Sequence, residues 1–269
     1  MSAFSRPAPK SDRTMTLLTD LNVVWHLVFR PRAGRGHADW LNRFYKTQAG
    51  DYDSFRKRLL KGRERLWEEL GARSPSLRDA VWVDMGGGTG SNMAGFGDRL
   101  SELEKVYILD LAKPLLDIAD ERIKEAGWTN VETVEADATA WTPPEGKADV
   151  VTFSYSLTMI PDWFRAVDHA MSILKPGGLI GVVDFYVARK FPHQRQEAQG
   201  FATRSFWPAW FSCDNVFLSS DHYPYLDYRF ETEFFVDEKL KVPYFPVFWW
   251  KVPYYIYIGR KPLEGGAGV

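Results

Sequence analysis

The chain has 269 residues, of which 45% are hydrophobic and 26% charged, a balance typical of a globular protein with a large buried core. Its net charge of −1 argues against nucleic acid as a general partner. A single cysteine, Cys213, excludes an internal disulfide, and the scattered histidines lack the spacing of metal ligands, so we expect no metal site.

No stretch has the length and uniform apolarity of a transmembrane helix, and the N-terminus lacks the apolar run and cleavage site of a signal peptide. We therefore expect a soluble, cytoplasmic protein. Residues 1–73 carry an excess of Lys and Arg over Asp and Glu. Such an excess can draw a surface to an anionic membrane or an anionic substrate, although a solvated basic helix explains it equally well.

Residues 1–75 are predicted to form a tail and a helical cap. Apolar side chains recur at helical spacing over residues 15–29, 38–49 and 54–70, and Gly71 is the predicted end of the third helix. The first of these helices has an apolar face that suits packing on the core or a peripheral contact with a membrane surface.

Residues 76–185 alternate between short apolar runs and helical patterns, which predicts a parallel sheet covered by helices on both faces. The expected strands are residues 80–85, 106–109, 131–134, 150–153 and 179–183. The expected helices are residues 114–126, ending at Gly127, and residues 162–174, followed by a turn at 175–178. Residues 186–269 are predicted to form an aromatic-rich substrate segment with late strands at 228–236 and 254–259 and a glycine-rich tail.

Glycines follow the first predicted strand in the run Val83-Asp84-Met85-Gly86-Gly87-Gly88-Thr89-Gly90. Glycines at a strand end let the backbone approach a ligand because no Cβ stands in the way, but similar spacing occurs in many nucleotide sites. Two acids make the signal more specific. Asp110 ends the second strand, where a carboxylate can accept both hydroxyls of a ribose, and Asp137 follows the third, where it can meet an adenine amino group. Ordinary capping of strand ends is the alternative explanation for these acids.

Together, these glycines and acids resemble the class I S-adenosylmethionine-dependent methyltransferases. The resemblance implies an α/β, Rossmann-like fold with a seven-stranded, mostly parallel sheet in the order 3-2-1-4-5-7-6, here with an N-terminal helical cap. It also implies that S-adenosyl-L-methionine is the cofactor and lies over the carboxyl ends of the strands. The predicted cofactor-binding residues are Arg63, Asp84, Gly86, Gly87, Gly88, Gly90, Asp110, Leu111, Asp137, Ala138, Ser154 and Tyr155.

A narrower resemblance, to the methyltransferase part of betaine lipid synthases, rests on residues 44–53, 56–66, 206–211, 220–226 and 251–256. That family trimethylates the amine of diacylglyceryl-homoserine. The resemblance implies a lipid or small-molecule amine as substrate. It also implies a partner protein or a fused domain that transfers the aminocarboxypropyl group of S-adenosylmethionine to diacylglycerol.

Methyl transfer to an amine needs positioning and desolvation more than a nucleophilic side chain. Tyr45 and Tyr52 are the predicted contacts of the substrate amine, and His222 is a candidate proton acceptor. Packing in the core is the alternative role for the two tyrosines, and a structural hydrogen bond is the alternative for His222. Arg63 is expected to pair with a carboxylate of the cofactor or of the homoserine.

The sequence thus predicts an N-methyltransferase that acts on the homoserine headgroup of a diacylglycerol lipid. Aromatic faces would attract the quaternary ammonium of the product or line acyl chains, while ordinary core packing is the other explanation for Trp207, Trp210, Trp249 and Trp250. One alternative function is a small-molecule or quinone methyltransferase on the same fold. Another is a non-catalytic, cofactor-binding regulatory subunit.

Overall fold

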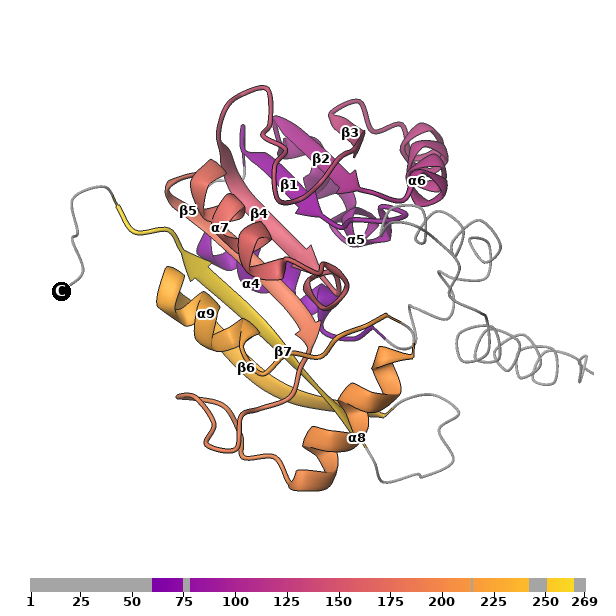
Figure 1. The fold of residues 1–269 in the computed structure, drawn as a ribbon. Helices are drawn as coiled ribbons and strands as arrows, with labels where there is room; N and C mark the ends of the chain where they lie inside the picture. The colour runs from indigo at the N-terminus through magenta and orange to yellow at the C-terminus, as the bar shows by residue number, and fades with distance from the viewer. Residues whose placement is uncertain (1–59, 75–77, 214, 242–250, 264–269) are drawn as a thin grey trace, which may run out of the picture.

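The computed structural model describes residues 60–74, 78–213, 215–241 and 251–263 (Figure 1). Outside the described residues lie the predicted helices over residues 15–29 and 38–49, and with them Tyr45, Tyr52, Trp249 and Trp250. In the part of the chain that is described, no helix combines the length and the apolarity needed to cross a bilayer.

The described residues form a seven-stranded sheet with the strand order β3-β2-β1-β4-β5-β7-β6. Its strands are β1 (Val81–Met85), β2 (Lys105–Asp110), β3 (Val131–Glu135), β4 (Ala148–Ser154), β5 (Leu174–Phe185), β6 (Glu231–Lys241) and β7 (Lys251–Arg260). Strands β1 to β5 pair in parallel, and β7 runs antiparallel between β5 and β6. The predicted order and the mostly parallel sheet are therefore confirmed.

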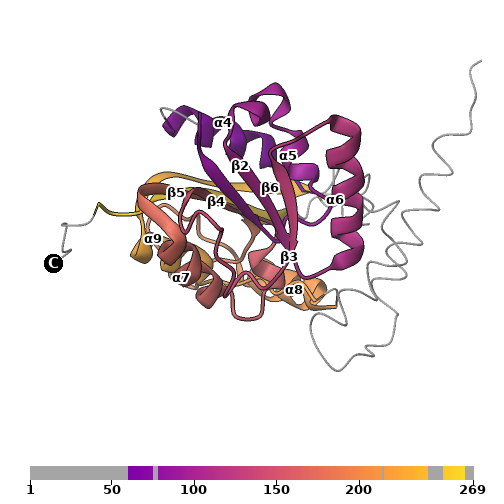
Figure 2. The ribbon, with the colours of Figure 1, turned by 90° about the horizontal axis from the view of Figure 1, so that it is seen from above.

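Helices cover both faces of the sheet, which explains why β1 is buried along its whole length and, apart from Asp84, apolar. They are α4 (Arg63–Arg73), α5 (Ser91–Ala94), α6 (Lys113–Ala126), α7 (Trp163–Ile173), α8 (Phe201–Ser212) and α9 (His222–Arg229). Figure 2 shows α4 and α5 on one side of the sheet and α7 and α9 on the other. One hydrophobic cluster includes Leu66 of α4 and Leu116 of α6, and a second, on the opposite face, includes Val167 of α7 and Leu226 of α9.

The helix predicted over residues 54–70 differs from α4 in the residues that the structure describes, whereas residues 54–59 lie outside them. Gly62 has φ +83°, a left-handed conformation that cannot continue a helix, so α4 begins at Arg63. Gly71, the predicted stop, lies inside α4, which ends at Arg73. A Cβ on Gly71 would lie 2.8 Å from a guanidinium nitrogen of Arg99, so close packing explains this glycine better than a helix end does.

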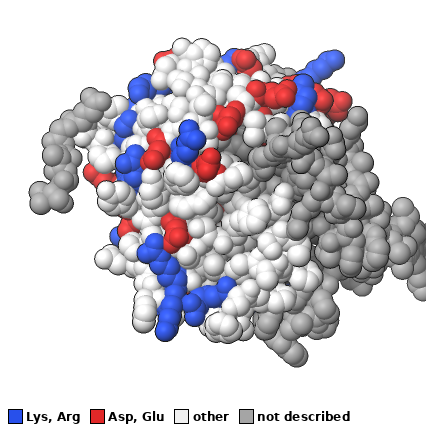
Figure 3. Space-filling model, viewed as in Figure 1, with Lys and Arg blue, Asp and Glu red and all other residues white. Residues whose placement is uncertain are grey.

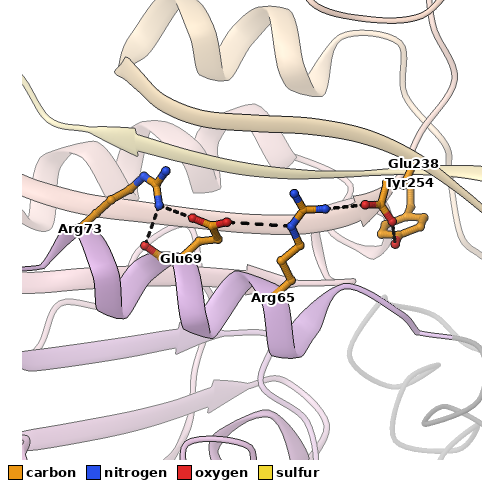
Figure 4. Close-up of polar contacts among 5 residues, drawn as sticks. All are labelled: Arg65, Glu69, Arg73, Glu238 and Tyr254. Atoms are coloured by element: carbon orange, nitrogen blue, oxygen red, sulfur yellow. Dashed lines mark hydrogen bonds and ion pairs between the residues drawn. The ribbon is translucent and has the colours of Figure 1, made fainter.

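A row of ion pairs fixes α4 to the late strands (Figure 4). Arg65 lies 2.6 Å from Glu238 of β6 and 3.9 Å from Glu69, which in turn pairs with Arg73. The hydroxyl of Tyr254 on β7 donates to Glu238 as well. Partly exposed pairs of this kind contribute about 0–1 kcal/mol each. Their main effect is to orient α4, so that its first turn is held beside the carboxyl end of β4.

The aromatic-rich segment contains two helices, α8 and α9, that the sequence pattern did not predict. Apolar residues of α8 occupy more than one face, and Pro208 lies inside it, so the helical period is obscured. The two late strands are confirmed, although β6 starts at Glu231 and β7 extends from Lys251 to Arg260. The turn expected at 175–178 is instead an irregular start of β5, where Gly177 has φ +78° and the pairing with β4 shifts register.

Candidate active site

The loop between β1 and α5 holds the glycines in conformations that other residues rarely adopt. Gly86, Gly88 and Gly90 have φ values of +73°, +57° and +67°. The amides of Gly86 and Gly87 both donate to the carbonyl of Leu109 at the end of β2, at 2.8 and 3.0 Å. A Cβ on Gly86 would lie 2.4 Å from the Cβ of Ser156. The loop is thus pressed against the residues that follow β2 and β4, and it has no room for a side chain at Gly86.

Asp84 lies fully buried beneath this loop. Its carboxylate accepts hydrogen bonds from Asn92 Nδ2 at 3.1 Å and Thr152 Oγ1 at 2.9 Å. Burial raises the pKa of Asp84, and these two donors oppose that shift. The geometry gives Asp84 the role of a support that joins β1, β4 and α5 under the glycine loop.

A pocket of about 420 Å³ opens beside the loop, above the carboxyl ends of β1 to β4. Its volume lies in the usual range for small-molecule sites. The predicted cofactor-binding residues that line it are Gly86, Asp110, Leu111, Asp137, Ala138 and Tyr155, while the others, Arg63, Asp84, Gly87, Gly88, Gly90 and Ser154, lie outside its wall. The sequence pattern missed Met159, Ile160, Pro161, Asp162 and Arg165, which also line it. Their position just after the fourth strand is the signal that would have found them.

Asp110 and Asp137 cap strand ends and also face this pocket. Asp110 accepts from the backbone amides of Gly88 at 2.9 Å and Ala112 at 2.8 Å. Asp137 accepts from the amide of Thr139 at 2.8 Å. A carboxylate has about four acceptor sites, so a carboxylate that caps a strand end can also accept from the hydroxyl or amino groups of a ligand. The capping explanation and the ligand-binding prediction are therefore compatible.

Arg63 lines a second pocket, of about 400 Å³, together with Lys61. Its Nε donates to Ser154 Oγ at 2.9 Å, and its guanidinium carbon lies 5.5 Å from the centre of the Tyr155 ring. The Tyr155 hydroxyl donates to the carbonyl of Lys61 at 2.6 Å. A guanidinium oriented in this way suits a ligand carboxylate.

The structure does not bring His222 to either pocket. The ring is fully buried, 4.7 Å from the Trp163 ring and 6.4 Å from the Tyr255 ring between centroids. Burial lowers the pKa of His222 to about 3, so the ring is neutral at physiological pH. This environment is that of a core residue, not that of a group that exchanges protons with a substrate.

A row of aromatic rings connects the first pocket with α8. The Tyr155 and Phe185 rings lie 4.7 Å apart, and the Phe185 and Phe211 rings lie 4.9 Å apart. Trp207, on the same buried side of α8, donates through Nε1 to the carbonyl of Lys251 at 3.0 Å. The rings from Tyr155 to Phe211, called the aromatic wall below, thus join the ends of β4 and β5 to α8.

The order of the strands, the glycine loop after β1 and the acids at the ends of β2 and β3 together define the class of the protein. It is a Rossmann-like, S-adenosylmethionine-dependent methyltransferase. The cradle itself fits the cofactor, because a Cβ would meet Ser156 at Gly86 and would lie 2.8 Å from Ile108 at Gly87. The residues that would hold the cofactor are the loop backbone, Asp110 and Asp137. Among the described residues, no group of His, Cys, Asp and Glu side chains is arranged to bind a metal ion.

The chain belongs to the ubiE/COQ5 methyltransferase family, whose model matches residues 37–229. It is 29% identical over 171 residues to the ubiquinone/menaquinone biosynthesis C-methyltransferase UbiE of Cronobacter sakazakii, which covers 63% of this chain and 68% of that protein. It is 30% identical over 162 residues to UbiE of an Escherichia coli strain, covering 60% and 64%. The chain thus spans about two thirds of the length of these relatives.

Solved structures share the fold. The cyclase SpnF has a TM-score of 0.62 at 17% identity, over 86% of this chain and 98% of that one. Phosphoethanolamine N-methyltransferase 2 of Haemonchus contortus, solved with phosphomonomethylethanolamine and S-adenosylhomocysteine, has a TM-score of 0.63 at 15% identity, over 94% of this chain and 74% of that one. At these identities the likeness establishes the fold alone.

Family membership establishes that the chain is a methyltransferase and that S-adenosyl-L-methionine is its cofactor. A non-catalytic regulatory subunit is therefore not supported. Neither the family match nor the shared fold establishes the predicted homoserine amine as the acceptor.

Proposed function

We propose that this enzyme methylates an acceptor carried on long apolar chains, with the reacting group held beside Tyr155 at the end of β4. One observation carries the proposal: the aromatic wall leads without interruption from the cofactor pocket through Phe185 to Phe211 of α8. The three rings are themselves buried, so an apolar chain would bind in the pocket against its own apolar lining, which includes Leu111, Met159 and Ile160.

We assign three side chains the roles in cofactor binding that the sequence predicts for them. Asp110 would accept the ribose hydroxyls, Asp137 the adenine amino group, and Arg63 would pair with the carboxylate. When bound, the cofactor supplies a methyl group activated by a positively charged sulfur and leaves as S-adenosylhomocysteine. The protein's contribution is to hold the acceptor in line and to exclude water.

Tyr155 is the residue best placed for this positioning. It has φ +56°, which is uncommon for a residue with a bulky side chain, and its ring is buried between Arg63 and Phe185. Backbone strain of this kind costs about 1–3 kcal/mol and persists where the surroundings enforce it, often at functional sites. The hydroxyl bond to Lys61 and the contact with Arg63 are what enforce it here.

The first candidate acceptor is a ring carbon of a quinone-type lipid, which the family and the named relatives favour. Methylation at carbon replaces a C–H bond by a C–CH3 bond, so the ring proton must pass to a base. Asp162 lines the pocket, and its side chain is 58% exposed, with Arg165 at 3.9 Å. Asp162 is the carboxylate that we assign to this proton.

The second candidate is the amine of diacylglyceryl-homoserine, favoured by contacts among the segments that resemble betaine lipid synthases. The indole Nε1 of Trp207 donates a hydrogen bond to the carbonyl of Lys251. Gly62 packs against the ring of Tyr254, because a Cβ on Gly62 would lie 2.7 Å from that ring. Residues 251–256 also lie beyond the part that the family model matches. A neutral amine attacks with its lone pair and releases its proton to water, so no base is required. A partner protein or a fused domain would supply this lipid.

The test offers three acceptors in separate reactions: a prenylated quinol lacking its ring methyl group, diacylglyceryl-homoserine, and a soluble primary amine. Each is mixed with the purified chain and methyl-labelled S-adenosylmethionine in detergent micelles, and the products are separated by solvent extraction. The Gly86→Ala variant serves as the inactive control, because the added Cβ would lie 2.4 Å from the Cβ of Ser156. Label in the quinone selects the first candidate, and label in a betaine lipid selects the second. Label only in the soluble amine would contradict the proposal of a lipid-borne acceptor.

A further inference from the structure

We propose that α8 and the loops that flank it form a membrane-docking surface that delivers a lipid-borne acceptor to the site, an inference that rests on the proposed function. The surface consists of the exposed rings of Phe191, Phe201, Trp210 and Phe217, called the aromatic surface below. These are four of the seven large apolar side chains that are exposed in the described chain. Their concentration in one stretch of 27 residues argues for a partner, because single exposed apolar residues are normally scattered.

Charge indicates what kind of partner the aromatic surface fits. Residues 189–217 contain four Lys and Arg and two acids, Glu197 and Asp214. Glu197 is paired with Lys239 of β6 at 2.6 Å, and Arg189 is paired with Asp221 at 2.6 Å. Lys190 Nζ lies 5.5 Å from the centre of the exposed Phe191 ring. In Figure 3 the charged side chains at the lower left margin of the molecule are blue, beside an uncharged white surface. Exposed rings beside Lys and Arg suit the interface of an anionic bilayer, where rings enter the headgroup region and cations meet lipid phosphates.

The placement of α8 connects this surface with the site. Phe201 and Trp210 are exposed, whereas Trp207 and Phe211 of the same helix are buried, and Phe211 belongs to the aromatic wall. Figure 1 shows α8 at the lower edge of the molecule, beyond the end of β5. The buried side of α8 therefore contacts the wall of the site, and the exposed Phe201 at the first position of the helix continues the surface of the preceding loop.

A groove of about 360 Å³ lies on the same route. Phe217 lines it, and the Phe217 amide donates to the carbonyl of Thr158 at 2.8 Å, which fixes the segment after α8 against the residues that follow β4. The groove shares Ile160 and Pro161 with the cofactor pocket. An apolar chain that leaves a bilayer at the aromatic surface would reach the pocket along this groove without crossing open water.

The experiment compares the wild-type chain with the double variant Phe191→Ser/Phe201→Ser in vesicle flotation. The vesicles are phosphatidylcholine alone or phosphatidylcholine with phosphatidylglycerol. The control is Tyr228→Ser, because Tyr228 is 81% exposed and close in exposure to Phe191 (79%) and Phe201 (78%), but lies on α9. We expect the wild type and the control to float with anionic vesicles, and the double variant to bind at least about tenfold more weakly. The melting temperature of each variant shows that it is folded.

A second readout separates docking from catalysis. With acceptor in detergent micelles the double variant should methylate at the wild-type rate, whereas with acceptor in anionic vesicles its rate should fall in parallel with binding. Lys190→Glu should weaken binding to anionic vesicles. The binding that remains should depend little on the salt concentration, because the electrostatic attraction that salt screens has been removed. Equal flotation of the wild type and the double variant, or no flotation of the wild type, would overturn the docking surface. Normal vesicle binding together with methylation of soluble amines alone would instead overturn the proposed function and leave the surface intact.

Discussion

The carboxylate of Asp110 accepts a hydrogen bond from the backbone amide of Gly88, 2.9 Å away, so the acid at the end of β2 fixes the glycine loop that follows β1. Its other oxygen accepts from the amide of Ala112, just before α6. A side chain that we propose to meet a ribose therefore also shapes the loop that would lie under the cofactor. Cofactor affinity should depend on Asp110 both directly and through the loop.

Asp110→Ala should raise the Kd for S-adenosylmethionine about 10- to 100-fold, since hydrogen bonds to a charged group contribute about 1.5–3 kcal/mol. Titration calorimetry measures this directly, and circular dichroism checks that the fold is retained. Asp117→Ala is the matched control, because Asp117 is an exposed acid on α6 that pairs with Lys113. Unchanged affinity in Asp110→Ala would remove Asp110 from the cofactor site.

Gly86→Ala should abolish cofactor binding. The added Cβ would lie 2.4 Å from the Cβ of Ser156, so the loop or the residues after β4 must move. Gly146→Ala separates this clash from backbone strain, because Gly146 has φ +79° but a Cβ added there would meet no atom within 4 Å. We expect the control to lose about 1–2 kcal/mol of stability and to keep its affinity. If both variants bind the cofactor equally well, the close approach at Gly86 has no functional role.

The features predicted correctly from the sequence are those that depend on neighbouring residues. Each of these features depends on a few consecutive residues. They are the buried strand β1, the glycines that follow it, and the end of α6 at Gly127, which has φ +69°. The prediction that this helix ends at Gly71 was wrong, because the sequence does not show which of its glycines, Gly62 or Gly71, can lie within a helix. What differs is their surroundings: the ring of Tyr254 faces Gly62, and Arg99 packs on Gly71.

Contacts in the site between residues far apart in the sequence could not be predicted either, because the sequence does not show which distant residues become neighbours. Arg63 and Ser154 are 91 positions apart, and no local pattern indicates that they meet. The core position of His222 was equally hidden, since Trp163 and Tyr255, which enclose it, come from α7 and β7. Tyr45 and Tyr52 lie outside the described residues, so their predicted contacts with the acceptor stay predictions.

Arg63→Gln should raise the KM for S-adenosylmethionine about tenfold or more, because the neutral amide loses the charge that would meet the cofactor carboxylate. It also loses the hydrogen bond to Ser154 and the contact with the Tyr155 ring. Arg65→Gln is the control on the same helix, since Arg65 pairs with Glu238 on the side of α4 that faces β6 (Figure 4). A similar KM in both variants would show that the effect comes from the stability of α4 and not from the site.

Asp184→Asn should change how stability depends on pH. Asp184 is fully buried at the end of β5, where it accepts from Thr158 Oγ1 at 2.8 Å and from the amide of Phe185 at 2.8 Å. Burial raises its pKa to about 7 from an ordinary value of 3.8, although these hydrogen bonds oppose the shift.

The sign follows from proton linkage. Between about pH 4 and pH 7 the folded chain keeps a proton on Asp184 that the unfolded chain releases, so this group's contribution to stability falls as the pH rises, by up to about 1.4 kcal/mol per pH unit. Below this window the contribution is complete, and above it the contribution is lost. Asn cannot ionise, so the difference in the free energy of unfolding, wild type minus Asp184→Asn, should fall across the window when it is measured by urea denaturation at several pH values. A difference that stays constant or rises with pH would mean that Asp184 is ionised in the folded chain, with Thr158 holding a charged carboxylate instead of a neutral one.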